Sequence, residues 1–324
     1  VYRPLSVGSH AAVFVAAGSR PWASHLANVV CHAAVCALVV AVSRAFLPAG
    51  AALAAGLLFA VHPIHTEPVN YLVGRAELLA AVGFLLAWRL AQMERPFAAG
   101  AAYLLGLASK ENAVGLPAFL LAGTWWFRRA GVGAGLAPAR RQWRWPSYIP
   151  LVGAAGLYFL LRRLALGTLE PPAWTEYDNI AAAAPAIDRI LTAIAALGRH
   201  LWLLVWPVHL SADYSYHQIP LVTSPATAGV WLTLLVLILA CGYAWRRRLD
   251  RPEAGLGLLL FAVTYAPVSN FLFPIGTLVA ERLLYVPSIG FCLFAVAVGR
   301  DAALFRPRGA PIGVAALLAV VVII

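Results

Sequence analysis

A succession of apolar runs, each ended by a short polar segment, constrains this chain more than any other feature. Of its 324 residues, 62% are hydrophobic and 11% are charged, whereas soluble domains carry about 25% charged residues. A helix that crosses a bilayer needs about 20 apolar residues. Ten candidate spans can be drawn, at residues 24–47, 49–63, 77–93, 97–111, 114–129, 147–165, 227–246, 255–270, 282–299 and 309–324. We therefore predict an all-α, polytopic membrane helix bundle that forms a single domain over residues 1–324.

The positive charge of the chain lies at the ends of these runs. The formal net charge is +11 and Lys110 is the only lysine, so nearly all of the cations are arginines. Membrane proteins keep their excess Arg and Lys in cytoplasmic loops, which explains this pattern better than a nucleic-acid partner does. Alternate connections carry the arginines, at positions 44, 89–95, 128–144, 246–251 and 300–308. We predict that these loops are cytoplasmic, that the opposite ends of the spans are luminal, and that the chain binds a lipid bilayer and no nucleic acid.

The long stretch at residues 166–226 is then a luminal loop region. Within it, residues 186–207 are apolar enough to suggest one more span, but Asp188, Thr192 and Arg199 share one helical face. An extra span would also move the arginines at 246–251 to the luminal side, against the positive-inside pattern. We therefore expect an amphipathic helix that lies in the luminal interface.

The segment FAVHPIHTEPVNYLVGRAELLA, residues 59–80, places several polar side chains between two apolar runs. Ionisable groups at a membrane are costly unless they line a polar cavity or find partners, so this segment is a candidate site. His62, His65 and Glu67 could supply metal ligands, because His-x-x-His places both rings on one helical face. Histidines that hydrogen-bond a loop are the alternative. Without a third and a fourth ligand we expect no metal ion.

Charged side chains also lie where the neighbouring spans begin and end. Arg75 and Glu77 either form a structural ion pair or orient an anionic substrate. Lys110 either pairs with the adjacent Glu111 or serves as a point charge for a phosphate group. The sequence alone leaves both alternatives open.

Two further segments combine groups that suit phosphate or sugar. Arg162 and Arg163 point about 100° apart on a helix, so at most one faces a cavity, where its planar fork suits phosphate oxygens. Snorkelling to the interface is the alternative role for these arginines. Asp213 and Tyr214 offer a carboxylate and an aromatic ring, which suit a sugar; an interfacial aromatic belt is the alternative.

Glu281 and Arg282 lie at the luminal mouth of the span at 282–299. Each polar group alone has a structural explanation, but together they gather on one predicted side of the membrane. Because charges near lipid need partners or water, we expect a shared luminal cavity. The residues expected to converge on it include His62, Arg75, Lys110, Arg163 and Glu281.

Six segments together resemble one family, the transmembrane, tetratricopeptide-repeat-containing O-mannosyltransferases. They are YRPL (2–5), HLANVVCH (25–32), FAVHPIHTEPVNYLVGRAELLAA (59–81), LASKENAVGLP (107–117), LWLLVWPVHLSADYSY (201–216) and FPIGTLVAERLLYVPSIGFCL (273–293). They occur in the order of that family and cover nearly the whole chain. Any one of them is a weak signal, whereas six in sequence are specific.

The resemblance implies a glycosyltransferase-C type of fold and a multi-pass position in the endoplasmic reticulum membrane. It implies transfer of mannose from dolichyl-phosphate-mannose to Ser or Thr of secretory-pathway proteins such as cadherins. On the basis of this resemblance, we expect Lys110, Arg162, Arg163 and Arg282 to bind the donor phosphate. The luminal cavity or sugar would be contacted by His62, His65, Glu67, Arg75, Glu77, Glu111, Asp213, Tyr214 and Glu281. We expect no metal and no other cofactor.

Family enzymes also carry a catalytic carboxylate and tetratricopeptide repeats. We expect the carboxylate to precede Val1 and the acceptor-binding repeats to follow Ile324, so that residues 1–324 alone are inactive. Three other functions remain open: a solute transporter with buried ionisable groups, a non-catalytic membrane scaffold, and a glycosyltransferase that uses another lipid-linked sugar. Against a transporter, the two halves of the chain show no corresponding repeats.

Overall fold

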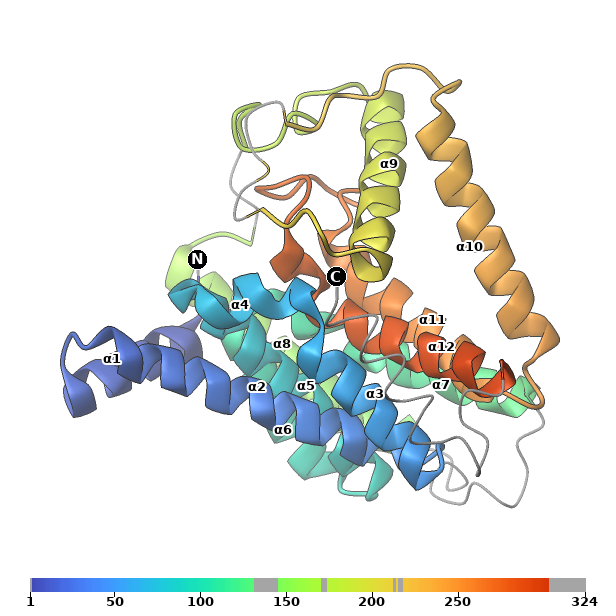
Figure 1. The fold of residues 1–324 in the computed structure, drawn as a ribbon. Coiled ribbons are helices and arrows are strands. Elements are labelled where there is room, and N and C mark those ends of the chain that lie inside the picture. The colour runs from blue at the N-terminus through green and yellow to red at the C-terminus, as the bar shows by residue number, and fades with distance from the viewer. Residues whose placement is uncertain (1, 131–144, 170–173, 212–213, 215–217, 303–324) are drawn as a thin grey trace.

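The computed structural model describes residues 2–130, 145–169, 174–211, 214 and 218–302, and all regular secondary structure in these ranges is helical (Figure 1). The predicted all-α class is confirmed. The helices are α1 (Pro4–Ala17), α2 (Pro21–Ser43), α3 (Ala49–Val61), α4 (Thr66–Asn70), α5 (Arg75–Gln92), α6 (Pro96–Ser109), α7 (Leu116–Arg129), α8 (Ile149–Leu166), α9 (Ala186–Val205), α10 (Ala228–Arg246), α11 (Pro252–Tyr265) and α12 (Pro287–Asp301). The 3-10 turns are η1 (Pro63–His65), η2 (Leu72–Gly74), η3 (Glu111–Gly115), η5 (Trp145–Tyr148), η6 (Ala266–Val268) and η7 (Glu281–Leu284).

Nine of the ten predicted spans coincide with helices, namely α2, α3, α5, α6, α7, α8, α10, α11 and α12. The tenth, at residues 309–324, lies outside the described residues. Proline occupies the first or second position of seven helices, where its missing N–H has no helical partner to lose. Helix α1 has no counterpart among the predicted elements.

Three helices among the described residues are long and apolar enough to cross a membrane: Pro21–Ser43, Pro146–Leu166 and Ala228–Arg246. A fourth candidate is the pair Ala49–Val61 and Pro63–Asn70, if this bent pair, which turns by 53°, counts as one span. Helices α6, α7, α11 and α12 are shorter than the predicted runs. The chain is thus a membrane protein by these helices, while the number of ten spans stays a prediction.

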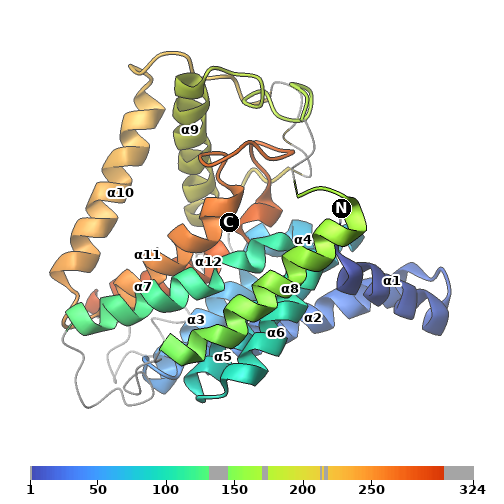
Figure 2. The ribbon, with the colours of Figure 1, turned by 180° about the vertical axis from the view of Figure 1, so that it is seen from behind.

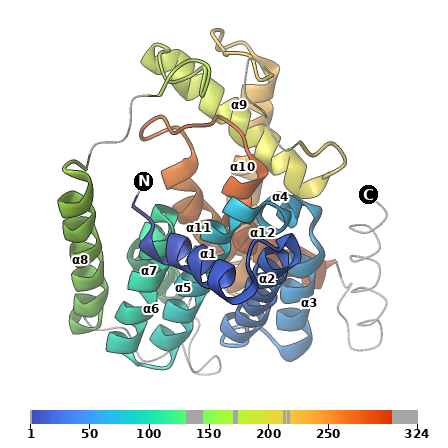
Figure 3. The same cartoon turned by 90° about the vertical axis from the view of Figure 1, so that its left-hand side faces the viewer.

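The helices form one bundle with a shared apolar core. Helix α5 packs against α2 and α6, α6 also packs against α8, and α11 packs between α7 and α12. Figures 2 and 3 show α8, α6, α5 and α3 running alongside one another. Two pairs approach especially closely through glycine. A Cβ on Gly83 of α5 would lie 2.5 Å from the Gly106 Cα of α6, and one on Gly257 of α11 would lie 2.5 Å from the Gly290 oxygen of α12.

The bundle has two chemically different ends. At the end that we call the arginine end, helices α2, α5, α7, α10 and α12 finish, and the chain returns through arginine-bearing connections. Contacts there join the returning segments, as between Gln92 Nε2 and the Val42 oxygen at 3.1 Å or Trp126 Nε1 and the Pro252 oxygen at 2.8 Å. At the opposite end, which we call the site end, α3, α6, α8 and α11 finish.

Helices α9 and α10 extend away from the other helices and pack against each other, and both also contact α11 (Figure 1). A helix is present at the predicted position as α9, whose buried face includes Leu191, Leu197 and Leu204; Thr192, expected to share a polar face with Asp188 and Arg199, is buried as well. It is not among the span candidates, and it runs across the direction of α3 and α6 in Figure 1. Its position in a membrane interface stays a prediction.

Candidate functional site

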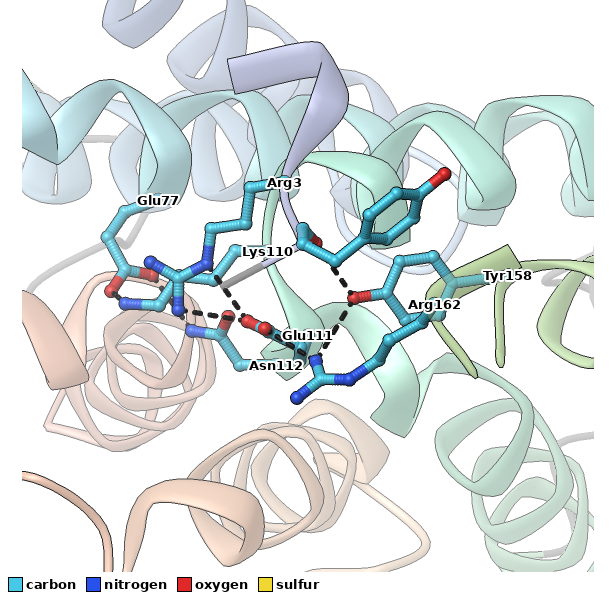
Figure 4. Close-up of polar contacts among 8 residues, drawn as sticks. Arg3, Glu77, Lys110, Glu111, Asn112, Tyr158 and Arg162 are labelled. Atoms are coloured by element: carbon cyan, nitrogen blue, oxygen red, sulfur yellow. Dashed lines mark hydrogen bonds and ion pairs between the residues drawn. The ribbon is translucent and has the colours of Figure 1, made fainter. Parts of the chain in front are cut away.

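Lys110 and its neighbours form a polar network at the site end (Figure 4). Helix α6 ends at Ser109, and Lys110 takes an extended backbone conformation before η3 begins. The Lys110 ammonium is ion-paired with Glu77, which lies buried in the first turn of α5. Asn112 Nδ2 donates to the other carboxylate oxygen of Glu77 at 2.8 Å. The alternative in which Lys110 pairs with Glu111 is therefore wrong, since Lys110 reaches across to another helix.

Glu111 is held instead by two arginines from distant parts of the chain (Figure 4). Arg3 donates to its Oε2 from Nε at 3.0 Å and from Nη2 at 2.9 Å, and Arg162 Nη1 donates to its Oε1 at 2.7 Å. Arg162 also lies 3.4 Å from the Tyr158 hydroxyl, one helical turn earlier in α8. Arg163, the next residue, is exposed, as expected for adjacent helical positions.

Sequence reasoning missed Arg3. The residue lies in the YRPL segment that contributed to the family resemblance, but no chemical pattern near it indicated a role. Only the fold brings Arg3 to Glu111, 108 residues away in the sequence. With Arg3 included, three cations (Arg3, Lys110 and Arg162) face two carboxylates (Glu77 and Glu111), so the network carries one excess positive charge.

Arg75 does not pair with Glu77, so the ion-pair alternative for these two residues is also wrong. The guanidinium is buried, with 1% of its surface exposed, and donates to neutral oxygens only. Its Nε reaches Asn28 Oδ1 at 2.8 Å, its Nη2 the Ser24 oxygen at 2.9 Å and its Nη1 the Ser9 oxygen at 3.3 Å. Arg75 thus ties α1 and α2 to the start of α5.

A second acidic group surrounds η7. Glu67 is ion-paired with Arg282 and also accepts from the Arg282 backbone N–H at 2.8 Å. Glu281 is buried and accepts from the Ser211 N–H at 2.6 Å and the Tyr214 hydroxyl at 2.9 Å. Burial raises the pKa of Glu281, and burial together with the hydrogen bond to Glu281 raises the pKa of Tyr214 to about 12. Asp213 lies outside the described residues.

The two histidines of the segment at residues 59–80 form hydrogen bonds within the protein. His62 Nε2 donates to the Leu204 oxygen at 2.9 Å, and its Nδ1 accepts from the Ile64 N–H at 3.2 Å. His65 Nε2 lies 2.9 Å from Ser288 Oγ, and its ring centroid lies 4.1 Å from that of Phe59. His62 thus bonds the turn η1, but the other hydrogen bonds of the two rings go to helices α9 and α12, so the loop-bonding alternative is met only in part. No group of three His, Cys, Asp or Glu residues in the described part of the chain could hold a metal ion.

The described site residues therefore gather at one end of the bundle, as the sequence indicated, but in separate networks. Lys110 and Arg162 lie in the network of Figure 4, while Arg282, Glu67 and Glu281 surround η7. The single cavity shared by all of them stays a prediction.

Comparison with known proteins gives the family of the chain. The model of the family described as "Protein O-mannosyl-transferase TMTC, DUF1736" matches residues 168–241. Protein O-mannosyl-transferase TMTC3 of Mus musculus is 33% identical over 336 residues, and its human counterpart is 31% identical over 334 residues; each comparison covers 90% of this chain and 35% of the relative. TMTC4 of Mus musculus is 29% identical, over 90% of this chain and 46% of the relative.

The chain thus spans between a third and a half of the length of these curated relatives. No solved structure matches it. The family model covers α9 and most of α10, and the relatives extend the similarity to 90% of the chain. The chain therefore belongs to the TMTC family of protein O-mannosyl-transferases.

Proposed function

We propose that the protein containing this chain transfers mannose from dolichyl-phosphate-mannose to Ser or Thr of secretory-pathway proteins, within the endoplasmic reticulum membrane. The names of the relatives support an O-mannosyltransferase, and the apolar helices support a membrane position. The donor, the acceptor and the compartment are part of the proposal.

The excess positive charge at the site end is the observation that carries the proposal. Arg3, Lys110 and Arg162 outnumber the carboxylates that face them. Guanidinium forks and an ammonium are the groups that proteins use to bind phosphate oxygens. The same side of α8 carries an apolar surface for a lipid, since Phe159 and Leu166, each about one helical turn from Arg162, are 38% and 40% exposed. A polyprenyl chain could lie along α8 while its phosphate reaches Arg162.

The chemistry follows from this placement. An acceptor hydroxyl attacks the anomeric carbon of mannose, a base takes the hydroxyl proton, and the bond from that carbon to the phosphate oxygen breaks. The leaving phosphate keeps the electron pair, and the nearby cations stabilise its charge. Glu67, Glu77 and Glu111 are each paired with cations. We propose them as partners of the cations and propose that no metal ion takes part.

Lys110→Ala tests this proposal in membranes that contain the protein. We expect mannosyl transfer from radiolabelled dolichyl-phosphate-mannose, per molecule of protein, to fall about ten- to a hundredfold, because a charged hydrogen bond contributes about 1.5–3 kcal/mol. Lys110→Arg should restore part of the activity, because its planar fork replaces a compact ammonium imperfectly. Addition of a metal chelator should leave the transfer of the wild-type protein unchanged.

Arg300→Ala is the matched control. Arg300 pairs with the buried Glu253 at the arginine end, as Lys110 pairs with the buried Glu77 at the site end. Both substitutions leave a buried carboxylate without its cation, so both should lower the amount of folded protein. Only Lys110→Ala should lower transfer per folded molecule. Equal transfer per molecule in the two variants would remove Lys110 from the phosphate site and contradict the proposal.

A further inference from the structure

Glu111 at the site end is held by two arginines, an arrangement that Asp301 shares at the arginine end. Each of its two oxygens is bound by a different arginine, Oε2 by the Nε and Nη2 atoms of Arg3 and Oε1 by Nη1 of Arg162. The three side chains come from three parts of the fold: the residue before α1, the turn η3 and the helix α8. A carboxylate held in this way presents two anionic oxygens to two guanidinium groups, which is also how a phosphate monoester binds.

The Glu111 side chain can leave this position, whereas that of Glu77 cannot. The side chains of Arg3, Glu111 and Arg162 are 28%, 30% and 16% exposed, so water and ligands reach the two ion pairs. Glu77 is 2% exposed and is fixed by Lys110 and Asn112 together. A partly exposed ion pair is held by little net free energy, since water competes for both partners. Exchange of the anion therefore costs least at Arg3 and Arg162.

We propose that Arg3 and Arg162 bind the phosphate group of the substrate, and that Glu111 occupies this place when no phosphate is bound. The ligand class is a phosphate monoester or diester, carried on a polyprenyl lipid or free in water. The incoming phosphate displaces the Glu111 carboxylate, which turns toward solvent. The inference rests on the proposed function, and it gives Glu111 the role of an internal competitor for Arg3 and Arg162.

This role has a consequence that a purely structural ion pair lacks. Glu111→Gln and Arg3→Gln break the same ion pair, but they change the charge of the site in opposite directions. Loss of the Glu111 charge removes the competitor and leaves Arg3 and Arg162 free for an anion. Loss of the Arg3 charge removes half of the anion site. If the pair only braces α1 and α8, both substitutions should weaken the fold and change phosphate affinity in the same direction.

The experiment measures binding of a short-chain polyprenyl phosphate to the purified chain in detergent, with inorganic phosphate alone as a second arm. We expect Glu111→Gln to bind the lipid phosphate about tenfold more tightly than the wild type, and Arg3→Gln about tenfold more weakly, the size expected for one charged hydrogen bond. The two arms identify the source of the phosphate. If the substitutions change the affinity for the lipid phosphate but not for inorganic phosphate, the ligand is a lipid donor. If they change both affinities, the site recognises the phosphate group alone. Either effect supports the exchange.

Two controls keep the test independent of folding and of the proposed function. Glu111→Asp keeps the charge but shortens the side chain, and should bind no more tightly than the wild type. Glu253→Gln removes a carboxylate paired with Arg300 at the arginine end and should leave binding unchanged. If the wild type binds phosphate but Glu111→Gln binds no more tightly, the exchange is wrong while the phosphate site stands. If neither the wild type nor Glu111→Gln binds either phosphate, both proposals are wrong.

Discussion

Glu281 differs from the other acidic residues at the site end because its partners are neutral donors. Ser211 N–H and the Tyr214 hydroxyl both reach its Oε1, and Arg199 lies over the Tyr214 ring at 5.3 Å. Burial favours the protonated carboxyl and raises its pKa above the usual range. Ionisation of Glu281 therefore opposes folding, and this loss of stability appears as the pH rises from the usual glutamate pKa through the raised one.

Tyr214→Phe should make the protein more sensitive to pH. The Tyr214 hydroxyl stabilises the ionised form of Glu281, so its removal raises the pKa of Glu281 further. We expect the loss of stability to be about 1.5–3 kcal/mol at a pH high enough to ionise Glu281, and smaller at a low pH that keeps Glu281 protonated. Melting temperatures of the detergent-solubilised protein at the two pH values measure this difference.

The control for this substitution is Tyr71→Phe, because Tyr71 is 58% exposed. It should change the melting temperature equally little at both pH values. The Glu281→Gln variant should lack the pH dependence of stability that ionisation of Glu281 causes. Its stability relative to the wild type should therefore increase as the pH rises. An equal loss at both pH values in Tyr214→Phe would mean that its hydroxyl does not act through the carboxylate.

The sequence revealed which residues are polar in an apolar setting, and this located Lys110, Glu111, Arg162 and Glu281 at one end of the bundle. It could not reveal their partners. Neighbours in sequence suggested that Lys110 pairs with Glu111, whereas a backbone that leaves α6 in an extended conformation turns the two side chains to different helices. Such pairings depend on helix packing between segments 33 to 108 residues apart, which no local pattern encodes.

The helices themselves were more predictable than their role in a membrane. Apolar runs that end at proline or at charged residues gave the positions of nine helices. Yet α3, α6, α7, α11 and α12 contain only 13 to 15 residues, because the runs are interrupted by turns such as η1, η3 and η6. At about 1.5 Å per residue, such a helix is shorter than an apolar bilayer core of about 30 Å. Helix α1 was missed because its run is short and contains serine, glycine and histidine.

Close packing of α11 and α12 predicts which glycines tolerate a methyl group. A Cβ on Gly257 would lie 2.5 Å from the Gly290 oxygen and 3.0 Å from the Phe294 nitrogen, so the two backbones would have to separate. We expect Gly257→Ala to destabilise the protein by about 1–3 kcal/mol. The readout is the thermal or denaturant stability of the protein in detergent.

Gly242→Ala in α10 is the matched control, since nothing lies within 4 Å of its Cβ position. There the usual advantage of alanine over glycine in a helix, about 0.5–1 kcal/mol, should leave the protein as stable or more stable. A tolerated Gly257→Ala would show that α11 and α12 are packed less closely than their backbones indicate.

The two ends of the bundle carry separate clusters of charged residues. At the arginine end, Asp301 of α12 binds Arg247 and Arg251, and Tyr243 donates to the same carboxylate at 3.0 Å. This cluster joins α10, α11 and α12, while the polar networks of the site end lie at the other ends of the helices. Such an alternation agrees with the positive-inside pattern that the sequence indicated. It fixes which connections share a side, and a single chemical test can then decide which side is luminal.

Engineered glycosylation decides the orientation of the whole molecule. An Asn-x-Thr acceptor made by Glu176→Asn with Asp178→Thr lies in an exposed turn at the site end, and one made by Arg248→Asn with Asp250→Thr lies at the arginine end, where Asp250 is exposed. Because glycosylation acts only on luminal segments and arginine-rich loops stay cytoplasmic, we expect the first acceptor to be modified in microsomes and the second to remain unmodified. The size shift and its removal by a glycosidase measure the outcome. Modification of the second acceptor alone would invert the bundle, move the networks of Arg3, Lys110 and Arg282 to the cytoplasm, and separate them from acceptors in the secretory pathway.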